Sequence, residues 1–137
     1  MNIYLRGFIY LMVGVTGEVI YTAVKALIKQ KDATLHGYTQ MWVMPLYYLG
    51  GILIFEKLHL AIMQWNIAVR FIIYALLIFL VEYVAGYITK KITGKCAWEY
   101  KGKYNIHGFI NLPHFPFWGA AGLLFEIVHN YLLSLHI

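Results

Sequence analysis

The sequence predicts an all-α integral membrane protein with four transmembrane helices that form two tandem two-helix repeats. Of its 137 residues, 61% are hydrophobic and only 12% are charged, and its mean hydropathy is +0.65. A soluble domain of this size cannot bury so much apolar surface. The apolar residues also occupy consecutive positions in runs of about 20, the length that crosses a bilayer as a helix. Finally, the same polar motifs occur in both halves of the chain.

Four segments are expected to span the membrane, in order Ile3–Ile28, a part of Tyr38–Trp65, Ile67–Tyr87 and roughly Pro116–Leu135. Their consecutive apolar positions argue against a β-barrel, whose strands alternate apolar and polar residues. The first segment is not read as a cleavable signal peptide, because no small-residue cleavage site follows it and its apolar run continues past Glu18.

The distribution of positive charge predicts the orientation. Three cations, Arg6, Lys57 and Arg70, lie on one side of the predicted membrane. Cytoplasmic loops carry the excess of lysine and arginine, so we expect the loops after spans one and three inside and both termini outside. The lysines there should also contact anionic lipid headgroups, and no nucleic-acid partner is needed to explain the net charge of +5. The lysines of those loops and their flanks are Lys25, Lys29, Lys31, Lys90, Lys91, Lys95, Lys101 and Lys103.

An internal repeat is the strongest pattern in the sequence. In each half a His-Gly pair is followed, nine residues after the His, by a Pro that leads into Phe-Glu-x-x-His. Each Pro is expected to begin a span, because proline fits the first turn of a helix. The motifs are His36-Gly37, Pro45 and Phe55–His59 in the first half, and His107-Gly108, Pro116 and Phe125–His129 in the second.

The repeat also predicts symmetry. Two spans per repeat make both repeats enter the membrane in the same direction, so a pseudo-two-fold axis along the membrane normal should relate them. We expect a single transmembrane domain over residues 1–137, with repeat one at about 3–65 and repeat two at about 67–137. Residues 106–116, which contain Pro113, should not form regular helix and could lie at the interface or re-enter the membrane.

Four glutamates fall inside the predicted spans, where charged groups are costly and mark ligand sites or helix contacts. Glu18 shares a helix face with Gly14, and Glu126 shares one with Gly122, which predicts that both face the bundle interior. Together with two basic or aromatic residues, the glutamates make the expected ligand-binding set of Glu18, Glu56, Glu82, Glu126, Arg70 and Trp98.

In chain order the polar pattern reads Glu, Glu-x-x-His, Glu, Glu-x-x-His, as in di-iron and di-manganese carboxylate bundles. It predicts a divalent metal site made of Glu18, Glu56, His59, Glu82, Glu126 and His129. Against this hypothesis, Glu56 and Glu82 are expected to differ in height along the membrane normal by about 5 to 15 Å. A difference of about 15 Å would be too large for a compact metal site. The structural alternative is that these glutamates are hydrogen-bonded between helices or paired with a base, as Glu56 would be with Arg70.

Other chemistry is sparse. The 137 residues contain no P-loop, so transport driven by ATP would require a separate ATPase subunit. Ser134 is the only serine, which argues against a Ser-His-Asp hydrolase. Cys96 is the only cysteine and lies in a lysine-rich loop, which suits a reducing cytosolic face.

Five stretches carry a family resemblance: "GEVIYTA", "FEKLHL", "NIAVRFIIYALLIFLVEYVAG", "CAWEYKGKYNIHGFINL" and "WGAAGLLFE". Together they resemble the ABC-transporter type IV (CmpB-like) family, which includes the transmembrane protein 229 proteins of animals. The resemblance covers nearly the whole chain and is specific at the glutamates, at Arg70 and at the box of Cys96, Trp98, Glu99 and Tyr100. The family box usually reads Cys-Pro-Trp-Asp-Tyr-Ser, so this chain departs from it at Ala97, Glu99 and Lys101. The resemblance implies a permease component with a membrane-embedded polar centre.

Three functions therefore stay open. The first is a transporter-like or binding protein whose carboxylates receive a cation, a proton or a polar ligand between the repeats. The second is a metal-carboxylate or acid-base membrane enzyme, acting for example on lipid. The third is an assembly subunit whose polar residues fasten helices. A homo-oligomer is also compatible with the sequence, because four short spans enclose little volume and a second copy could complete a pathway.

Overall fold

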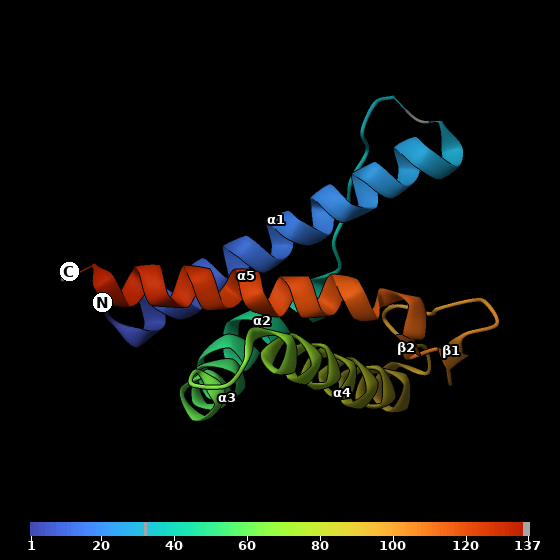
Figure 1. The fold of residues 1–137 in the computed structure, drawn as a ribbon. Coiled ribbons are helices and arrows are strands. Elements are labelled where there is room, and N and C mark those ends of the chain that lie inside the picture. The colour runs from blue at the N-terminus through green and yellow to red at the C-terminus, as the bar shows by residue number, and fades with distance from the viewer. Residues whose placement is uncertain (32, 136–137) are drawn as a thin grey trace. The chain divides into compact units, whose positions relative to one another are not determined.

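The structure, a computed structural model, describes residues 1–31 and 33–135 and is predominantly helical (Figure 1). An all-α fold was predicted, and the described strands amount to one small hairpin. In chain order the elements are α1 (Ile3–Gln30), the 3₁₀ helix η1 (Met41–Val43), α2 (Met44–Gly50), the π-helix η2 (Gly51–Phe55), α3 (Glu56–Ile62), α4 (Ile67–Thr93), β1 (Asn105–Ile106), β2 (Ile110–Asn111), the 3₁₀ helix η3 (Leu112–His114) and α5 (Phe115–Ser134).

The chain divides into two compact units. Unit 1 comprises Met1–Lys57 together with Leu135, and unit 2 comprises Leu58–Ser134. The division falls inside α3, between Lys57 and Leu58. Each unit is described below by itself.

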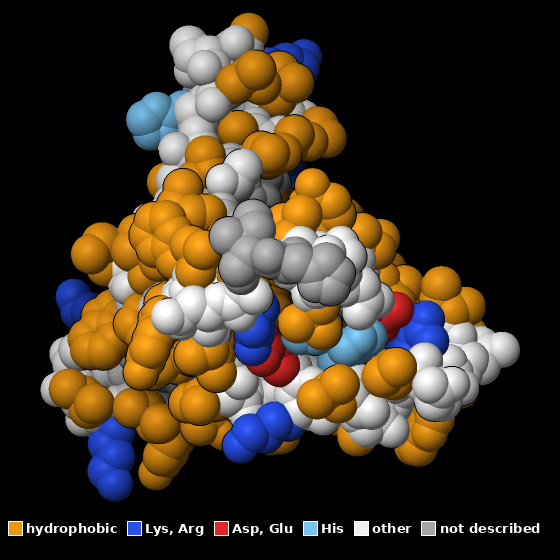
Figure 2. Space-filling model, turned by 90° about the vertical axis from the view of Figure 1, so that its left-hand side faces the viewer, with side chains coloured by type: hydrophobic (Ala, Val, Ile, Leu, Met, Phe, Trp, Pro, Cys, Tyr) orange, Lys and Arg blue, Asp and Glu red, His pale blue; other side chains and the backbone are white. Residues whose placement is uncertain are grey.

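In the part of the chain that the structure describes, three helical segments are long and apolar enough to cross a membrane: α1, the continuous stretch Met41–Ile62, and α4. Their large apolar side chains are exposed over much of the surface, as Phe8, Leu53 and Leu80 illustrate. Figure 2 shows such side chains over much of the visible face. A water-soluble monomer rarely exposes apolar patches of this extent, whereas a bilayer requires them. The protein is therefore an integral membrane protein.

Helix α5 is not among these three segments. It has 20 residues, enough to span the hydrocarbon core, but Glu126, His129 and Asn130 reduce its mean hydropathy. The fourth predicted span stays a prediction for this reason.

In unit 1, α1 begins at a capped end and packs on α2. The side chain of Asn2 accepts a hydrogen bond from the backbone N–H of Tyr4 at 2.8 Å, which satisfies one of the free donors of the first turn. A Cβ atom on Gly14 would lie 2.3 Å from the ring of Tyr47 in α2. Gly14 thus allows the close approach that the sequence predicted for this face of the helix.

The second helical stretch of unit 1 begins as predicted, because Pro45 occupies the first turn of α2. After the seven residues of α2, the helix widens into the π-helix Gly51–Phe55. A π turn accommodates one residue more than an α turn does. This extra residue accounts for the different spacing of the two halves, eleven residues from Pro45 to Glu56 and ten from Pro116 to Glu126.

In unit 2, α5 runs alongside α4 (Figure 1). Asn66 caps α4 by accepting a hydrogen bond from the N–H of Ala68 at 2.8 Å, and Gly94 ends it in the left-handed conformation with a φ of 77°. Between the two helices, β1 and β2 form an antiparallel hairpin with Asn105 opposite Asn111.

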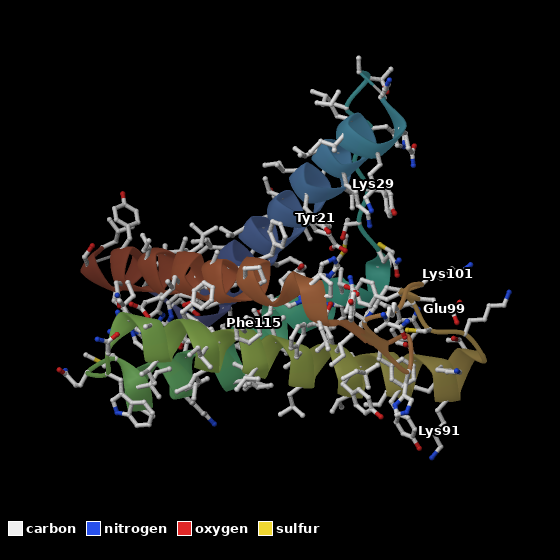
Figure 3. The ribbon with its side chains drawn as sticks, turned by 45° about the vertical axis from the view of Figure 1, so that its right-hand side comes forward. Tyr21, Lys29, Lys91, Glu99, Lys101 and Phe115 are labelled. Atoms are coloured by element: carbon white, nitrogen blue, oxygen red, sulfur yellow. The ribbon has the colours of Figure 1, made fainter. Side chains whose placement is uncertain are left out.

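The segment before α5 is irregular, as its prolines predict. Pro113 lies in the short 3₁₀ helix η3, and Pro116 is the second residue of α5. The ring of Phe115, at the start of α5, has its centroid 6.1 Å from that of Phe79 and 6.2 Å from that of Phe71, both in α4 (Figure 3). Aromatic packing thus joins the start of α5 to α4.

Candidate functional site

Each unit contains one carboxylate held by an arginine and a tyrosine. In unit 1, Arg6 of α1 donates two hydrogen bonds to Glu56, from Nε to Oε1 at 2.8 Å and from Nη2 to Oε2 at 3.0 Å. Tyr10, one turn further along α1, donates its hydroxyl proton to Oε1 of Glu56 at 2.9 Å. Tyr10 is fully buried and Glu56 is 8% exposed. A bidentate guanidinium–carboxylate pair is among the strongest polar contacts in proteins.

The pairing that the sequence predicted for Glu56 is therefore wrong. Arg70 was expected as its partner because both residues flank the connection after the second helical stretch. Glu56 instead faces Arg6 on α1, and Arg70 binds the other Phe-Glu-x-x-His glutamate.

In unit 2, Arg70 of α4 places Nη2 at 3.0 Å from Oε1 of Glu126 on α5. Tyr74, one turn along α4, donates its hydroxyl proton to Oε2 of Glu126 at 2.8 Å. His59 of α3 adds to this group, with Nδ1 2.9 Å from the Tyr74 hydroxyl and 3.5 Å from Oε2 of Glu126. Its Nε2 lies 3.1 Å from Oδ1 of Asn130. These five side chains and His129 are called the Glu126 cluster below.

The Glu126 cluster is shielded from the surroundings. His59 is 3% exposed and His129 is 2% exposed, and their rings meet edge to face with centroids 5.2 Å apart. Arg70 also donates through Nη1 to the carbonyl oxygens of Met63 at 2.8 Å and Trp65 at 2.9 Å. The guanidinium is therefore fixed in position as well as charged.

Glu82 lies in a separate polar group of unit 2. It accepts hydrogen bonds from the hydroxyl of Tyr100 at 2.8 Å and from the indole N–H of Trp118 at 3.0 Å. Glu82 follows Arg70 by twelve residues on α4, a rise of about 18 Å. Glu82 and Glu126 thus lie at different heights in unit 2, because Glu126 binds Arg70. In unit 1, Glu18 accepts a hydrogen bond from Thr39 at 2.6 Å.

The chain matches a known protein family. The model of a family described as "Putative ABC-transporter type IV" matches residues 7–137. The chain belongs to this family. No solved structure matches this family member. The family description and the three apolar helices together fit a membrane protein of the transporter-like class.

The Cys96–Tyr100 box of this family member holds the loop after α4 against the β-hairpin. The Trp98 indole N–H donates to the carbonyl oxygen of Phe109 at 2.9 Å, and the Cys96 thiol donates to the carbonyl oxygen of Trp98 at 2.6 Å. The N–H of Tyr100 donates to the carbonyl oxygen of Gly108 at 3.0 Å. The indole N–H of Trp98, expected to contact a ligand, is therefore engaged by the backbone.

The six predicted metal ligands of this family member are distributed over several groups. Within unit 2 the structure brings together His59, Glu126 and His129, and there the Glu126 carboxylate binds Arg70 and Tyr74. Among residues 1–31 and 33–135, no three His, Cys, Asp or Glu side chains are placed to hold a metal ion. An ion at Glu126 would have to displace a guanidinium of the same charge sign.

Sequence reasoning missed four residues of these clusters, Arg6, Tyr10, Tyr74 and Asn130. For Arg6, Tyr10 and Tyr74, a second repeat carries the signal that could have found them. Residues 2–10 read NIYLRGFIY and residues 66–74 read NIAVRFIIY, identical at five of nine positions. The shared residues are the capping Asn, an Ile, the Arg that binds glutamate, another Ile, and the Tyr that binds the same glutamate.

Proposed function

We propose that this member of the ABC-transporter type IV family is a transporter-like membrane protein in which the Glu126 cluster receives a proton, a cation or a small polar ligand. The observation that carries the proposal is the burial of His59 and His129 beside Glu126. Ionisable groups within a membrane-spanning unit are costly, and they commonly form ion or proton pathways.

The hydrogen bonds of His59 are compatible with either a charged or a neutral ring. The Tyr74 hydroxyl donates to Glu126, so it can only accept from Nδ1 of His59, which must then carry a proton. Nε2 faces Oδ1 of Asn130 and would donate as well, which makes the ring an imidazolium. Rotation of the Asn130 amide by 180° would present its NH₂ group and fit a neutral ring. The two arrangements differ by one proton and one side-chain rotation.

The arginine sets the electrostatics of the proposed centre. Arg70 compensates Glu126, so a protonated His59 adds net positive charge and a neutral His59 leaves the pair balanced. Entry of a cation would require the loss of that proton or the displacement of Arg70. Proton binding at His59 is the simplest form of the proposal, because it needs no displacement.

The proposal includes the two-repeat architecture with α5 as a fourth span. At 1.5 Å per residue, the 20 residues of α5 rise about 30 Å, the thickness of a hydrocarbon core. The polar residues of α5 that lower its hydropathy bind α4 and α3 instead of facing lipid. The recurrence of Arg, Tyr and Glu in each unit supports a pseudo-two-fold relationship. If ATP drives transport, a separate ATPase subunit must supply it.

A purely structural role is the second candidate, and unit 1 favours it. Arg6 and Tyr10 satisfy Glu56 with three hydrogen bonds at 2.8–3.0 Å. Such a group can fasten α1 to the second helical stretch without binding anything else. An assembly subunit would use both clusters in this way.

The two functions are separated by the thermal unfolding midpoint of the chain in lipid nanodiscs, measured between pH 5 and 8 and with Na⁺, K⁺, Mg²⁺, Mn²⁺ or Zn²⁺ added singly. The proposal expects a pH- or cation-dependent midpoint that is lost in His59→Asn and Glu126→Gln. The matched control is His107→Asn, which makes the same substitution at a histidine outside the Glu126 cluster. Asparagine tolerates the backbone φ of 53° that His107 adopts. A wild-type profile that coincides with the profile of His59→Asn under every condition would establish the assembly role instead.

A further inference from the structure

Unit 1 contains a second polar feature that the Glu126 cluster does not use. A cavity of about 190 Å³ lies between the last turns of α1 and the segment that leads into η1. It is lined by Thr22, Lys25, Ala26, Lys29, Gln30, His36 and Tyr38. We call it the α1 basic pocket.

The wall of the pocket opposite α1 is held at a defined place. The hydroxyl of Thr22 accepts a hydrogen bond from the N–H of Tyr38 at 2.9 Å, and its own proton can be donated to the carbonyl oxygen of Tyr38 at 3.0 Å. Gly37 lies so close to α1 that a Cβ atom there would be 2.2 Å from the carbonyl oxygen of Val19. Only glycine permits this approach, so residues 37 and 38 fix the segment against the helix.

The pocket is basic. Lys25 and Lys29 lie one turn apart on α1, and the seven lining residues include His36 but no Asp or Glu. Like charges four residues apart repel each other and destabilise a helix. An anion between the two ammonium groups would turn this repulsion into attraction, and His36, Gln30 and Tyr38 could donate hydrogen bonds to its oxygens.

The length of α1 places the pocket at headgroup level. Its 28 residues rise about 42 Å, whereas a hydrocarbon core is about 30 Å thick. An upright α1 that enters the core at its first turn therefore extends about eight residues beyond the core at its C-terminal end. The pocket occupies the last turns of α1, where Lys29 is seen near the helix end (Figure 3), so its ammonium groups reach the layer of lipid phosphates.

Unit 2 has no corresponding basic pair. The positions 64 residues after Lys25 and Lys29 are Thr89 and Thr93. Thr89 is 4% exposed, and Thr93 donates to the carbonyl oxygen of Lys95 at 2.8 Å, so the loop after α4 covers this place. The last turns of α1 and α4 thus differ at this place.

We propose that the α1 basic pocket binds the phosphate group of an anionic lipid headgroup. Basic pockets beside the ends of transmembrane helices recognise such headgroups through charge and hydrogen bonds. A soluble phosphate compound would offer the same chemical group, so the experiment separates the two sources. The inference does not depend on the Glu126 cluster and stands if that cluster is purely structural.

Native mass spectrometry of the full chain in detergent tests the proposal by counting bound lipids. Phosphatidylglycerol and phosphatidylcholine are supplied at equal concentration, with and without inorganic phosphate. One phosphatidylglycerol per chain should be retained in preference to phosphatidylcholine. Each lysine near an anionic group contributes about fivefold in affinity, so Lys25→Gln/Lys29→Gln should weaken retention about 30-fold.

Two variants keep the result interpretable. Lys91→Gln/Lys101→Gln removes the same charge from unit 2, at positions labelled in Figure 3, and should retain the lipid. Lys25→Arg/Lys29→Arg preserves the charge and should also retain it, which separates binding from loss of fold. Equal retention of both lipids, or equal weakening by the control pair, would overturn the proposal. If inorganic phosphate binds at the pocket and phosphatidylglycerol does not, the lipid assignment is overturned in favour of a soluble phosphate compound.

Discussion

Replacing Arg70 with methionine should destabilise unit 2 by about 3 to 5 kcal/mol, the usual cost of removing one partner from a buried ion pair. The structure supports a value in this range. The side chains of Arg70 and Glu126 are 17% and 12% exposed and their charged atoms are 3.0 Å apart, so little solvent is available to replace the lost guanidinium. The two carbonyl oxygens that Arg70 also binds would lose their donor.

The decisive measurement is a double-mutant cycle with Glu126→Gln. If the two charges stabilise each other, Arg70→Met and Glu126→Gln combined should cost about 2 kcal/mol less than the sum of the single variants. Unfolding free energies can be measured in bicelles by reversible denaturation with sodium dodecyl sulfate, followed by circular dichroism. Glu82→Gln is the matched control, because it lies about 18 Å from Arg70 along α4 and binds Tyr100 and Trp118 instead.

The refuting result is additivity. If Arg70→Met and Glu126→Gln add to within about 0.5 kcal/mol, as distant sites do, the two charges are not energetically coupled. The same additivity is expected for Arg70→Met with Glu82→Gln. A coupling equally large for both pairs would show a general loosening of α4 and no specific ion pair.

Two further predictions concern packing and orientation. Gly122→Ala should destabilise unit 2 by about 1 to 3 kcal/mol through overpacking, since the new Cβ would lie 2.2 Å from Cβ of Tyr74. The control Gly17→Ala, whose new Cβ would have no atom within 4 Å, should be neutral or stabilising by up to about 1 kcal/mol. Thermal unfolding in nanodiscs compares the two variants, and equal losses of stability would contradict the α4–α5 contact. For orientation, Cys96 is the only cysteine, so a membrane-impermeant maleimide should label it in inside-out sealed vesicles and leave it unlabelled in right-side-out vesicles until detergent is added. The opposite pattern would reverse the predicted topology.

Helix positions and starts were predictable from the sequence because they depend on local signals. Pro45 and Pro116 mark the first turn of their helices, and the apolar runs define α1 and α4. The contacts of Gly14 with Tyr47 and of Gly122 with Tyr74 were also predictable in kind, since small residues mark helix contacts in membranes. These inferences need only the order of residues and the period of a helix.

The partners of the glutamates were not predictable in the same way. Pairing depends on which helix faces which, and Arg70 was assigned to Glu56 by its nearness along the chain. The motif at residues 2–10 and 66–74 would have corrected this, because it gives each Phe-Glu-x-x-His motif its own arginine. The metal hypothesis considered only the carboxylates and imidazoles and left out the nearby arginines. An arginine can bind both oxygens of a carboxylate, as a metal ion can.

The π turn at Gly51–Phe55 follows from the same electrostatic requirement. Each added residue rotates the rest of an α-helix by about 100°, and unit 1 has one residue more than unit 2 between its proline and its glutamate. In an unbroken α-helix, Glu56 would therefore point about 100° away from Arg6, where a carboxylate facing lipid would lose three hydrogen bonds and its countercharge. An isolated buried charge costs several kcal/mol, whereas a single π turn is a tolerated local irregularity. The helix widens because the Arg6–Glu56 pair stabilises the fold by more than the π turn costs.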